Sequence, residues 1–282
     1  MKFRLLLLVL GFIFIQSYES FSQGAEANPL APGQTSSAIY LGPVVGYNRS
    51  MHSVDLSSFV DDPLCPFFTN GANNGFYAGL SYEHLFGNVV GSRHSIIARV
   101  LYSTLPASFT KEGDEYPSLV DAGSGKYETV TSATRHSIEV SYNLISVEVM
   151  YKFNVVGNLG LTAGPAFDFP IKKTIEQKYE IIKPDNVQFK RVDVTQDKYK
   201  NYQYQNNDRT LIVYSGDIPE ASGFRLGLKF GIQYEIIMKG RWYVVPAVYY
   251  NLGLTNIGKK DAKTESWKVS AFQAGIDVRF AL

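Results

Sequence analysis

Charged side chains recur at alternate positions within otherwise apolar segments, and these are the residues best placed to do chemistry. In the segment 224–236, Arg225, Lys229 and Glu235 occupy odd positions, whereas most even positions hold large apolar residues. Successive side chains of a β-strand point to opposite faces, so this spacing places the charges on one face. The same reasoning along the chain predicts a shared interior lined by Glu83, Arg99, Glu139, Glu148, Lys152, Arg225, Lys229, Glu235, Asp277 and Arg279.

Acids and bases in this set are nearly balanced, which leaves two roles open. Paired charges would satisfy one another and fill a narrow interior, whereas charges kept apart and hydrated would line an ion-selective pore. A barrel of eight strands is just wide enough for its side chains to fill. We therefore expect a filled interior. The side chains that decide are Glu148, Lys152, Arg225 and Lys229: paired, they indicate a filled interior, and apart and hydrated, they indicate a pore.

Other reactive side chains give weak evidence for catalysis. His136 and Ser137 have the types of a catalytic pair, but such neighbours are common by chance. No phosphate-binding loop or CxxC motif is present, and the single Cys65 can form no internal disulfide. The four histidines lie in separate segments without metal-site spacing: His52, His84, His94 and His136. We expect no enzymatic activity, no metal and no cofactor.

Period-two alternation of apolar and polar residues recurs along the chain and identifies the elements that position the charges. Phe272 to Leu282 is a clear example, with Asp277 and Arg279 on the polar face. Such repetition is typical of β-strands with two different surfaces. The predicted strands cover approximately 39–48, 75–86, 94–106, 136–153, 159–170, 222–238, 241–254 and 267–282.

The connections between these strands alternate in length. Short ones at 87–93, 154–158 and 239–240 alternate with four long polar loops, predicted at 49–74, 107–135, 171–221 and 255–266. Short turns on one side and long loops on the other are typical of outer-membrane barrels. A closed sheet also leaves no unpaired edge in lipid. The fold class predicted is all-β, an eight-stranded antiparallel transmembrane β-barrel over residues 39–282, with short periplasmic turns and long extracellular loops.

The segment from Ile138 to Phe153 departs from simple alternation. Apolar residues occupy even positions from Ile138 to Leu144, and odd positions from Ile145 to Phe153. An extra residue would return all of them to one face. The pattern therefore predicts a β-bulge near Leu144.

The N-terminus predicts export. A basic start at Lys2 and Arg4 precedes an apolar run from Leu5 to Ile15, and the small residues Ser20 and Ser22 follow at the positions that a signal peptidase reads. This order is typical of a cleaved signal peptide, here residues 1–22, followed by a periplasmic segment at 23–38. Aromatic residues make up 14% of the chain and the net charge is +1. The near-neutral charge gives no reason to expect nucleic acid as a partner, whereas abundant aromatics suit contact with outer-membrane lipid.

Two stretches resemble known barrel families. Residues 250–257 and 272–280 resemble the last hairpin of the OmpA-like and PorT-like outer-membrane β-barrel families, and 147–153 with 161–165 resembles their central hairpin. The resemblance implies eight strands, both termini in the periplasm and no shared catalytic residues. It also implies recognition by the barrel-assembly machinery through the apolar face of the last strand: Phe272, Ile276, Val278, Phe280 and Leu282.

These observations predict a non-enzymatic outer-membrane barrel for surface interaction or envelope integrity. The alternative is a narrow pore for small solutes, or the barrel component of a secretion or assembly apparatus. The loop 171–221 is the longest and contains Tyr179, Tyr199, Tyr202 and Tyr204. Tyrosine-rich exposed segments suit recognition of a protein or glycan partner, although a solvated shield is an equal interpretation. Some alternation from Lys172 to Thr195 suggests that the strands extend into this segment as a hairpin.

Overall fold

Strands account for most of the described residues in the computed structural model. The structure describes residues 39–56, 68–86, 92–121, 126–193, 195–196, 199–238, 241–258 and 264–282. Within these ranges no helix is long and apolar enough to cross a membrane. The predicted signal peptide, the segment 23–38 and Cys65 lie outside the described residues. The strands are β1 (Ile39–Leu56), β2 (Phe68–Leu85), β3 (His94–Thr104), β4 (Ala107–Asp121), β5 (Tyr127–Val156), β6 (Leu159–Lys183), β7 (Gln203–Gln205), β8 (Thr210–Asp217), β9 (Arg225–Tyr234), β10 (Ile236–Ile237), β11 (Trp242–Gly253) and β12 (Thr264–Ala281).

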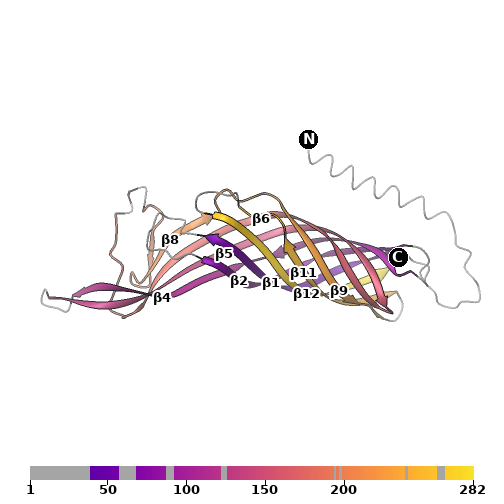
Figure 1. Ribbon diagram of the computed structural model, residues 1–282, viewed down its shortest axis with the longest axis horizontal. Helices are drawn as coiled ribbons and strands as arrows, with labels where there is room; N and C mark the ends of the chain where they lie inside the picture. The colour runs from indigo at the N-terminus through magenta and orange to yellow at the C-terminus, as the bar shows by residue number, and fades with distance from the viewer. Residues whose placement is uncertain are drawn as a thin grey trace, which may run out of the picture. The chain divides into compact units, whose positions relative to one another are not determined.

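The strands form one antiparallel sheet that closes into a ring (Figure 1). Hydrogen-bonded neighbours follow the circuit β1–β2–β3–β5–β6–β9–β11–β12, and β12 pairs with β1 again, for instance at Val44 and Asp277. β3 and β4 pair in succession with β5, while β9 and β8 pair in succession with β6. The predicted closed antiparallel sheet is therefore confirmed.

The ring has two different ends. The turn at Gly157–Asn158 and the β10–β11 connection lie at one end, which we call the short-turn end. Both described chain ends meet there, because the Leu282 N–H donates to the Ile39 carbonyl at 3.0 Å. We call the opposite end, where β6 leads into β7 and β8, the long-loop end. The β4–β5 hairpin extends beyond the ring at this end (Figure 1).

Several strands continue into segments that were predicted as loops, so the predicted loops 49–74, 107–135 and 171–221 are wrong over part of their length. Strand structure covers 49–56, 68–74, 107–121, 127–135 and 171–183. The prediction missed these extensions because it searched for apolar residues facing outward. Along β6 beyond residue 174 the outward residues are instead polar, as at Glu176 and Lys178, and the apolar ones, such as Ile175, point inward. The suggested extension from Lys172 is confirmed as strand as far as Lys183, and β6 pairs with β8 from Thr174 to Glu180.

β5 shows why the apparent change of phase near Leu144 was misinterpreted. Its even positions are buried without interruption from the apolar pair Ile138 and Val140 through to Glu148 and Lys152. The facing of the strand therefore never changes, and only the chemistry of its two faces does. A register shift does occur between Asn143 and Leu144 in the β5–β6 pairing, but the extra residue, Ile171, is on β6. The bulge predicted on β5 as the cause of the phase change is wrong.

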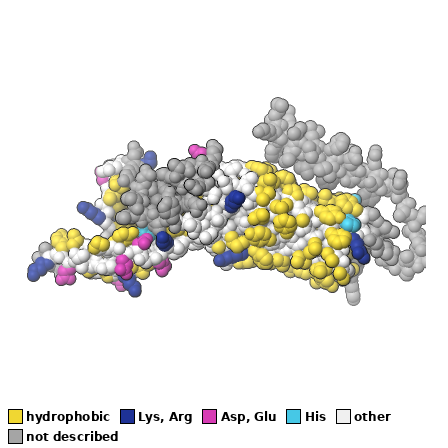
Figure 2. Space-filling model, viewed as in Figure 1, with side chains coloured by type: hydrophobic (Ala, Val, Ile, Leu, Met, Phe, Trp, Pro, Cys, Tyr) yellow, Lys and Arg dark blue, Asp and Glu magenta, His cyan; other side chains and the backbone are white. Residues whose placement is uncertain are grey.

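The outer surface consists of an apolar half and a polar half. Toward the short-turn end, large apolar side chains point outward, among them Leu80 (60% exposed), Val45 (60%) and Ile232 (53%). Figure 2 shows hydrophobic side chains gathered over this half, whereas toward β4 charged side chains lie among scattered hydrophobic ones. The same strands thus present an apolar exterior near the short turns and a polar exterior near the long loops.

Candidate functional site: the interior and the long-loop end

The first group of inner ion pairs centres on Glu148 of β5. Arg99 of β3 donates to Glu148 Oε2 through Nε at 2.9 Å and through Nη2 at 2.6 Å. Lys229 of β9 pairs with Glu148 Oε1. All three side chains are at most 1% exposed. A single carboxylate therefore pairs with two cations from two other strands.

A second group lies toward the short-turn end and centres on Glu83 of β2. Both Lys152 and Arg279 pair with this carboxylate. Lys152 also pairs with Glu235, which is 20% exposed, and Arg279 Nη2 lies 2.6 Å from Asp277 Oδ2. A cavity of 290 Å³ at this end is lined in part by Glu83, Glu235 and Arg279. The pairs thus continue to a polar vestibule.

A third group contains a residue that the sequence analysis did not include. Arg225 Nη2 lies 2.5 Å from Asp168 Oδ2, and Arg225 Nη1 donates to the Val269 carbonyl at 2.7 Å. Ser146 Oγ donates to Asp168 Oδ1 at 2.6 Å. Asp168 occupies the polar phase of its strand, between Phe167 and Phe169, and this alternation was the signal that could have identified it.

Nine of the ten predicted charges lie inside the ring, and the prediction for Glu139 is wrong. Glu139 is exposed on the outer face of β5, where it accepts a hydrogen bond from Ser108 Oγ at 2.7 Å. It belongs to the stretch of β5 whose outer face is polar. With Asp168 in its place, we call the set the inner ion-pair network: Glu83, Glu148, Asp168, Glu235, Asp277, Arg99, Lys152, Arg225, Lys229 and Arg279. Its five carboxylates balance its five cations.

Aromatic rings pack among these charges. The Arg99 guanidinium lies 4.2 Å from the ring centroid of Tyr249, and Lys229 Nζ lies 5.2 Å from the same centroid. Cations are attracted to the negative face of such a ring. A side chain at Gly231 would place its Cβ only 2.1 Å from Tyr249, so the glycine leaves room for this ring. Rings and ion pairs together occupy the interior of the short-turn half.

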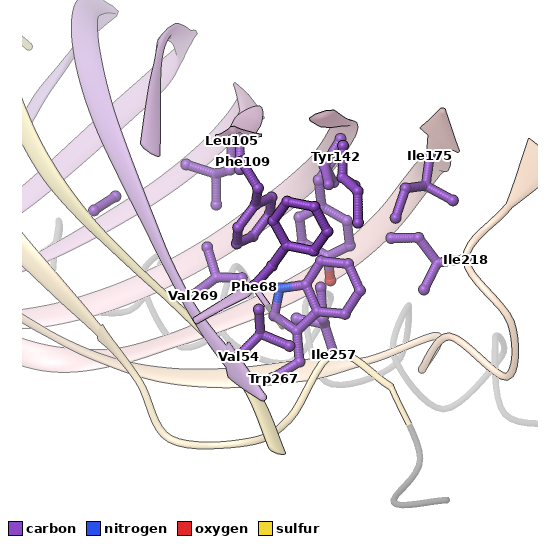
Figure 3. Close-up of a cluster of buried hydrophobic side chains, with 14 of the residues drawn as sticks. Val54, Phe68, Leu105, Phe109, Tyr142, Ile175, Ile218, Ile257, Trp267 and Val269 are labelled. Carbon is purple, nitrogen blue, oxygen red and sulfur yellow. The ribbon is translucent and has the colours of Figure 1, made fainter. Parts of the chain in front are cut away.

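Toward the long-loop end the interior becomes apolar. We call the buried cluster there the mouth core (Figure 3). Phe109 and Trp267 pack edge to face, with ring centroids 6.4 Å apart, and Phe109 contacts Phe68 in the same manner at 6.3 Å. Ile218 and Ile257 join the cluster from connecting segments. The full cluster is Val54, Phe68, Leu105, Ala107, Phe109, Ile138, Val140, Tyr142, Leu144, Ile175, Ile218, Ile257, Trp267, Val269 and Ala271.

His52 is a histidine embedded against the mouth core. Trp267 Nε1 donates to His52 Nδ1 at 3.1 Å, and His52 Nε2 lies 3.0 Å from the Leu105 carbonyl, to which it donates in the neutral tautomer. Burial in this apolar setting lowers the pKa of His52 to about 3. The side chain is therefore neutral at ordinary pH and contributes two hydrogen bonds to the packing.

The His136–Ser137 pair does not assemble a catalytic site. As adjacent residues of β5 the two side chains point to opposite faces. The His136 ring packs on Tyr179 at a centroid distance of 4.4 Å, and its Nε2 lies 3.9 Å from Asp114 Oδ2. In the ranges that the structure describes, no group of three or more His, Cys, Asp or Glu side chains is arranged to hold a metal ion.

A cleft of 500 Å³ lies at the long-loop end, beyond the mouth core. Its lining comes from β4, β5 and β6, from residues 187–190, from Tyr202 and from β8. Tyr179 and Tyr202 line the cleft, whereas Tyr204 hydrogen-bonds to the Val192 N–H through its hydroxyl at 3.0 Å. Tyr199 packs on Tyr202 with ring centroids 5.2 Å apart. The tyrosines predicted for an open loop thus belong to a folded structure.

The predicted assembly signal lies on the outer face of β12. Phe272, Ile276 and Leu282 are exposed, and Phe280 packs edge to face on Trp242 at 5.1 Å. Val278 shares their phase. All five residues therefore lie on the outer face of the ring, as the prediction requires, and their role in assembly stays a prediction.

Comparisons with known proteins give a likeness of fold only. No protein-family model matches the chain, and no curated protein matches it in sequence. Similar solved structures include the attachment invasion locus protein Ail of Yersinia pestis (TM-score 0.32, 13% identity, 87% of this chain and 100% of that chain covered), Neisserial surface protein A (0.33, 13%, 88% and 100%) and the outer membrane protease OmpT of Escherichia coli (0.35, 8%, 89% and 99%). Scores this low leave the function to be inferred from this chain's own residues, and the OmpA-like or PorT-like resemblance stays a prediction.

Proposed function

We propose that this chain is an outer-membrane β-barrel protein with eight transmembrane strands, a closed interior and a folded recognition structure on the cell surface. The observation that carries the proposal is that the polar and apolar faces of the sheet change sides at one height along the ring. On β5 the outward residues change from Asn143, Ser141 and Glu139 to Ile145 and Val147, while the inward ones change from apolar to charged. An apolar exterior around a polar interior is stable in lipid, and the reverse is stable in water.

Strand length supports the same division. β5 has 30 residues and β6 has 25, whereas a tilted strand crosses the hydrocarbon layer with about 9–11. The excess lies at the long-loop end, where the outward residues are polar. Aromatic pairs lie at both borders of the apolar half, Trp242 with Phe280 at one and Phe169 with Phe224 at the other. Such rings favour the membrane–water interface.

The inner ion-pair network supports a closed interior over the narrow pore. Glu148, Lys152, Arg225 and Lys229 are all paired, each with a residue of another strand, rather than apart and hydrated. The mouth core adds an apolar layer above them. With the interior filled, surface contact is left to the long-loop end, where rigid scaffolds commonly carry recognition. The protein would then act as a non-enzymatic surface protein without a cofactor.

Protease added to whole cells tests the orientation. Cleavage is expected after Lys190 or Lys200, which lie outside the strands between β6 and β8, while the short-turn end is spared. Lys178 and Lys183, within β6, should resist. Mass spectrometry of the same preparation should find a mature N-terminus near Gln23. Cleavage only after the outer membrane is opened, or an intact Met1 on inserted protein, would overturn the topology.

Single-channel recording tests the closed interior. Purified protein inserted in planar bilayers should show no steady conductance at the level of a general porin, because paired side chains fill the ring. The control is the same protein heated until it loses its compact mobility in gel electrophoresis. Stable ohmic steps from the folded form alone would show an open lumen and favour the pore.

A further inference from the structure

The cleft at the long-loop end continues the inward face of the sheet beyond the mouth core. Ser118 of β4 and Ser132 and Thr134 of β5 line it together with Tyr116, and Tyr202 joins the lining from the chain that leads into β7. Its volume of 500 Å³ lies within the roughly 300–1,000 Å³ of small-molecule sites. It is therefore a concave site of ligand size on the half of the molecule that faces water.

The lining combines aromatic rings with hydroxyl groups. Tyr116, Tyr179, Phe189 and Tyr202 contribute rings. Ser132 Oγ donates to Ser118 Oγ at 2.7 Å, and Thr134 Oγ1 donates to the Asp114 carbonyl at 3.2 Å, so the hydroxyls are held in place. Rings offer flat apolar surfaces that stack on C–H faces, and hydroxyls both donate and accept. A pyranose has both complementary features, an apolar C–H face and a rim of hydroxyls.

The charge of the lining favours a neutral ligand. Lys190 supplies one ammonium group and His136 one imidazole, and no carboxylate is found among the described residues that line the cleft. A polyanion calls for a cluster of cations, and a cation calls for carboxylates or an aromatic cage. This lining supplies neither a cluster of cations nor a carboxylate, and the Lys190 ammonium group would repel a cation placed against the rings.

Addition of a partner's strand to β4 is disfavoured. β4 pairs along its length with β5 and, within the described residues, with β2 at Ser108 alone, so its second edge is largely open. That edge contains Pro117, which has no N–H, and a bulge where Gly113 has a φ of +100°. Prolines and bulges on an edge prevent regular pairing with another chain. Recognition there must depend on side chains rather than on a backbone ladder.

We propose that this cleft binds a neutral oligosaccharide, with Tyr116 and Tyr202 as ring contacts and the hydroxyls of Ser118, Ser132 and Thr134 as polar contacts. The inference rests on the proposed function, because the cleft can meet external glycans only if the long-loop end faces outward. It deepens that function by assigning the ligand class and its site.

The test uses the full chain folded in detergent and an array of immobilised neutral and acidic oligosaccharides, followed by calorimetric titration of the best-bound neutral trisaccharide. Variants Tyr116→Ala and Tyr202→Ala remove rings, and Ser118→Trp fills the cleft without removing a ring. Tyr127→Ala is the matched control, since Tyr127 is 69% exposed on the same hairpin and does not line the cleft. Retention of the heat-dependent gel shift confirms that each variant folds.

Wild type and Tyr127→Ala should bind neutral sugars equally, and each of the three cleft variants should weaken binding by about tenfold or more, the size of a lost ring contact. A blank array with folded protein, binding of acidic sugars alone, or equal binding by all variants would overturn the inference. Failure of the proposed function is distinguishable, because it appears in the whole-cell protease test. A normal protease result with a blank array rejects the cleft ligand alone.

Discussion

The two halves of this barrel are built by the same strands with opposite chemistry. In the short-turn half, Leu80 points outward and Glu83 inward; in the long-loop half, Glu139 points outward and Val140 inward. The first arrangement is that of a membrane barrel and the second that of a water-soluble protein. Under the proposed function, the medium around a strand, rather than its pleat, decides which face is apolar. The border between the halves is where we place the outer surface of the membrane.

The interiors of the halves are stabilised by different forces. The inner ion-pair network depends on matched charges, because a buried charge without a partner is costly. The mouth core depends on packing and removal of apolar surface from water. Matched substitutions in the two halves should therefore have effects on stability that depend on the half.

The largest effect is expected from Glu148→Ala in the short-turn half. It leaves Arg99 and Lys229 buried without their carboxylate, which should lower the free energy of unfolding by about 3–5 kcal/mol. Glu139→Ala, on the polar exterior of the same strand, should change it by less than about 0.5 kcal/mol. Guanidinium unfolding followed by tryptophan fluorescence measures both. Equal effects would show that the network is hydrated and contributes little.

Phe109→Ala probes the mouth core and should be nearly as damaging. Phe109 is 1% exposed and packs on Phe68 and Trp267. Loss of a buried phenylalanine costs about 3–5 kcal/mol where the cavity cannot collapse. Leu119→Ala on the same β4 strand removes a side chain that is 72% exposed and serves as the control, with an expected change within about 0.5 kcal/mol. Indistinguishable unfolding midpoints for the two variants would reject a packed core at the mouth.

Outward arginines test the border itself. Leu80→Arg places a charge in the middle of the apolar band and should destabilise the protein in lipid vesicles by about 2–4 kcal/mol. Ser141→Arg makes the same addition on the polar exterior of β5 and should be close to neutral. The destabilisation caused by the two substitutions should become similar when it is measured without a bilayer. A large cost for Ser141→Arg in lipid would move the border toward the long loops.

Alternation identified the strands and nine interior charges, because a period of two is a local property that any strand with two different faces displays. The extent of the strands was missed for a physical reason. The apolar residues from Ile138 to Leu144 differ in phase from those that follow because they point inward where the outer face of β5 is polar, and a bulge on β5 was the wrong explanation. A phase change that coincides with polar outward residues on neighbouring strands was the available signal of a border.

The partners within the interior and the cleft could not be predicted, because they depend on which strands meet across the ring. Arg225 pairs with Asp168 of β6, and Glu148 pairs with Arg99 and Lys229, at separations of dozens of residues. The cleft likewise requires residues 187–190 and Tyr202 to lie against β4 and β5. Sequence spacing predicts which face of its strand a residue lies on. Its neighbours on other strands depend on the register in which the strands pair when the ring closes.

The smallest expected effect is the pH dependence of stability that His52 gives to the mouth core. His52 has its pKa lowered to about 3 by burial against the mouth core, whereas an unfolded histidine titrates near about 6.5. The unfolded chain therefore binds a proton that the folded chain refuses, so stability is lost as the pH falls below about 6.5, until about pH 3. Between pH 7.5 and pH 5 the loss should be about 2 kcal/mol. His52→Gln keeps a neutral polar side chain, and its loss over the same interval should be smaller than that of the wild type by this amount. The other histidines are unchanged in the variant, so their titration cancels in the difference between the two unfolding curves. Parallel pH dependence of variant and wild type would mean that water reaches His52 and that the mouth is not dry.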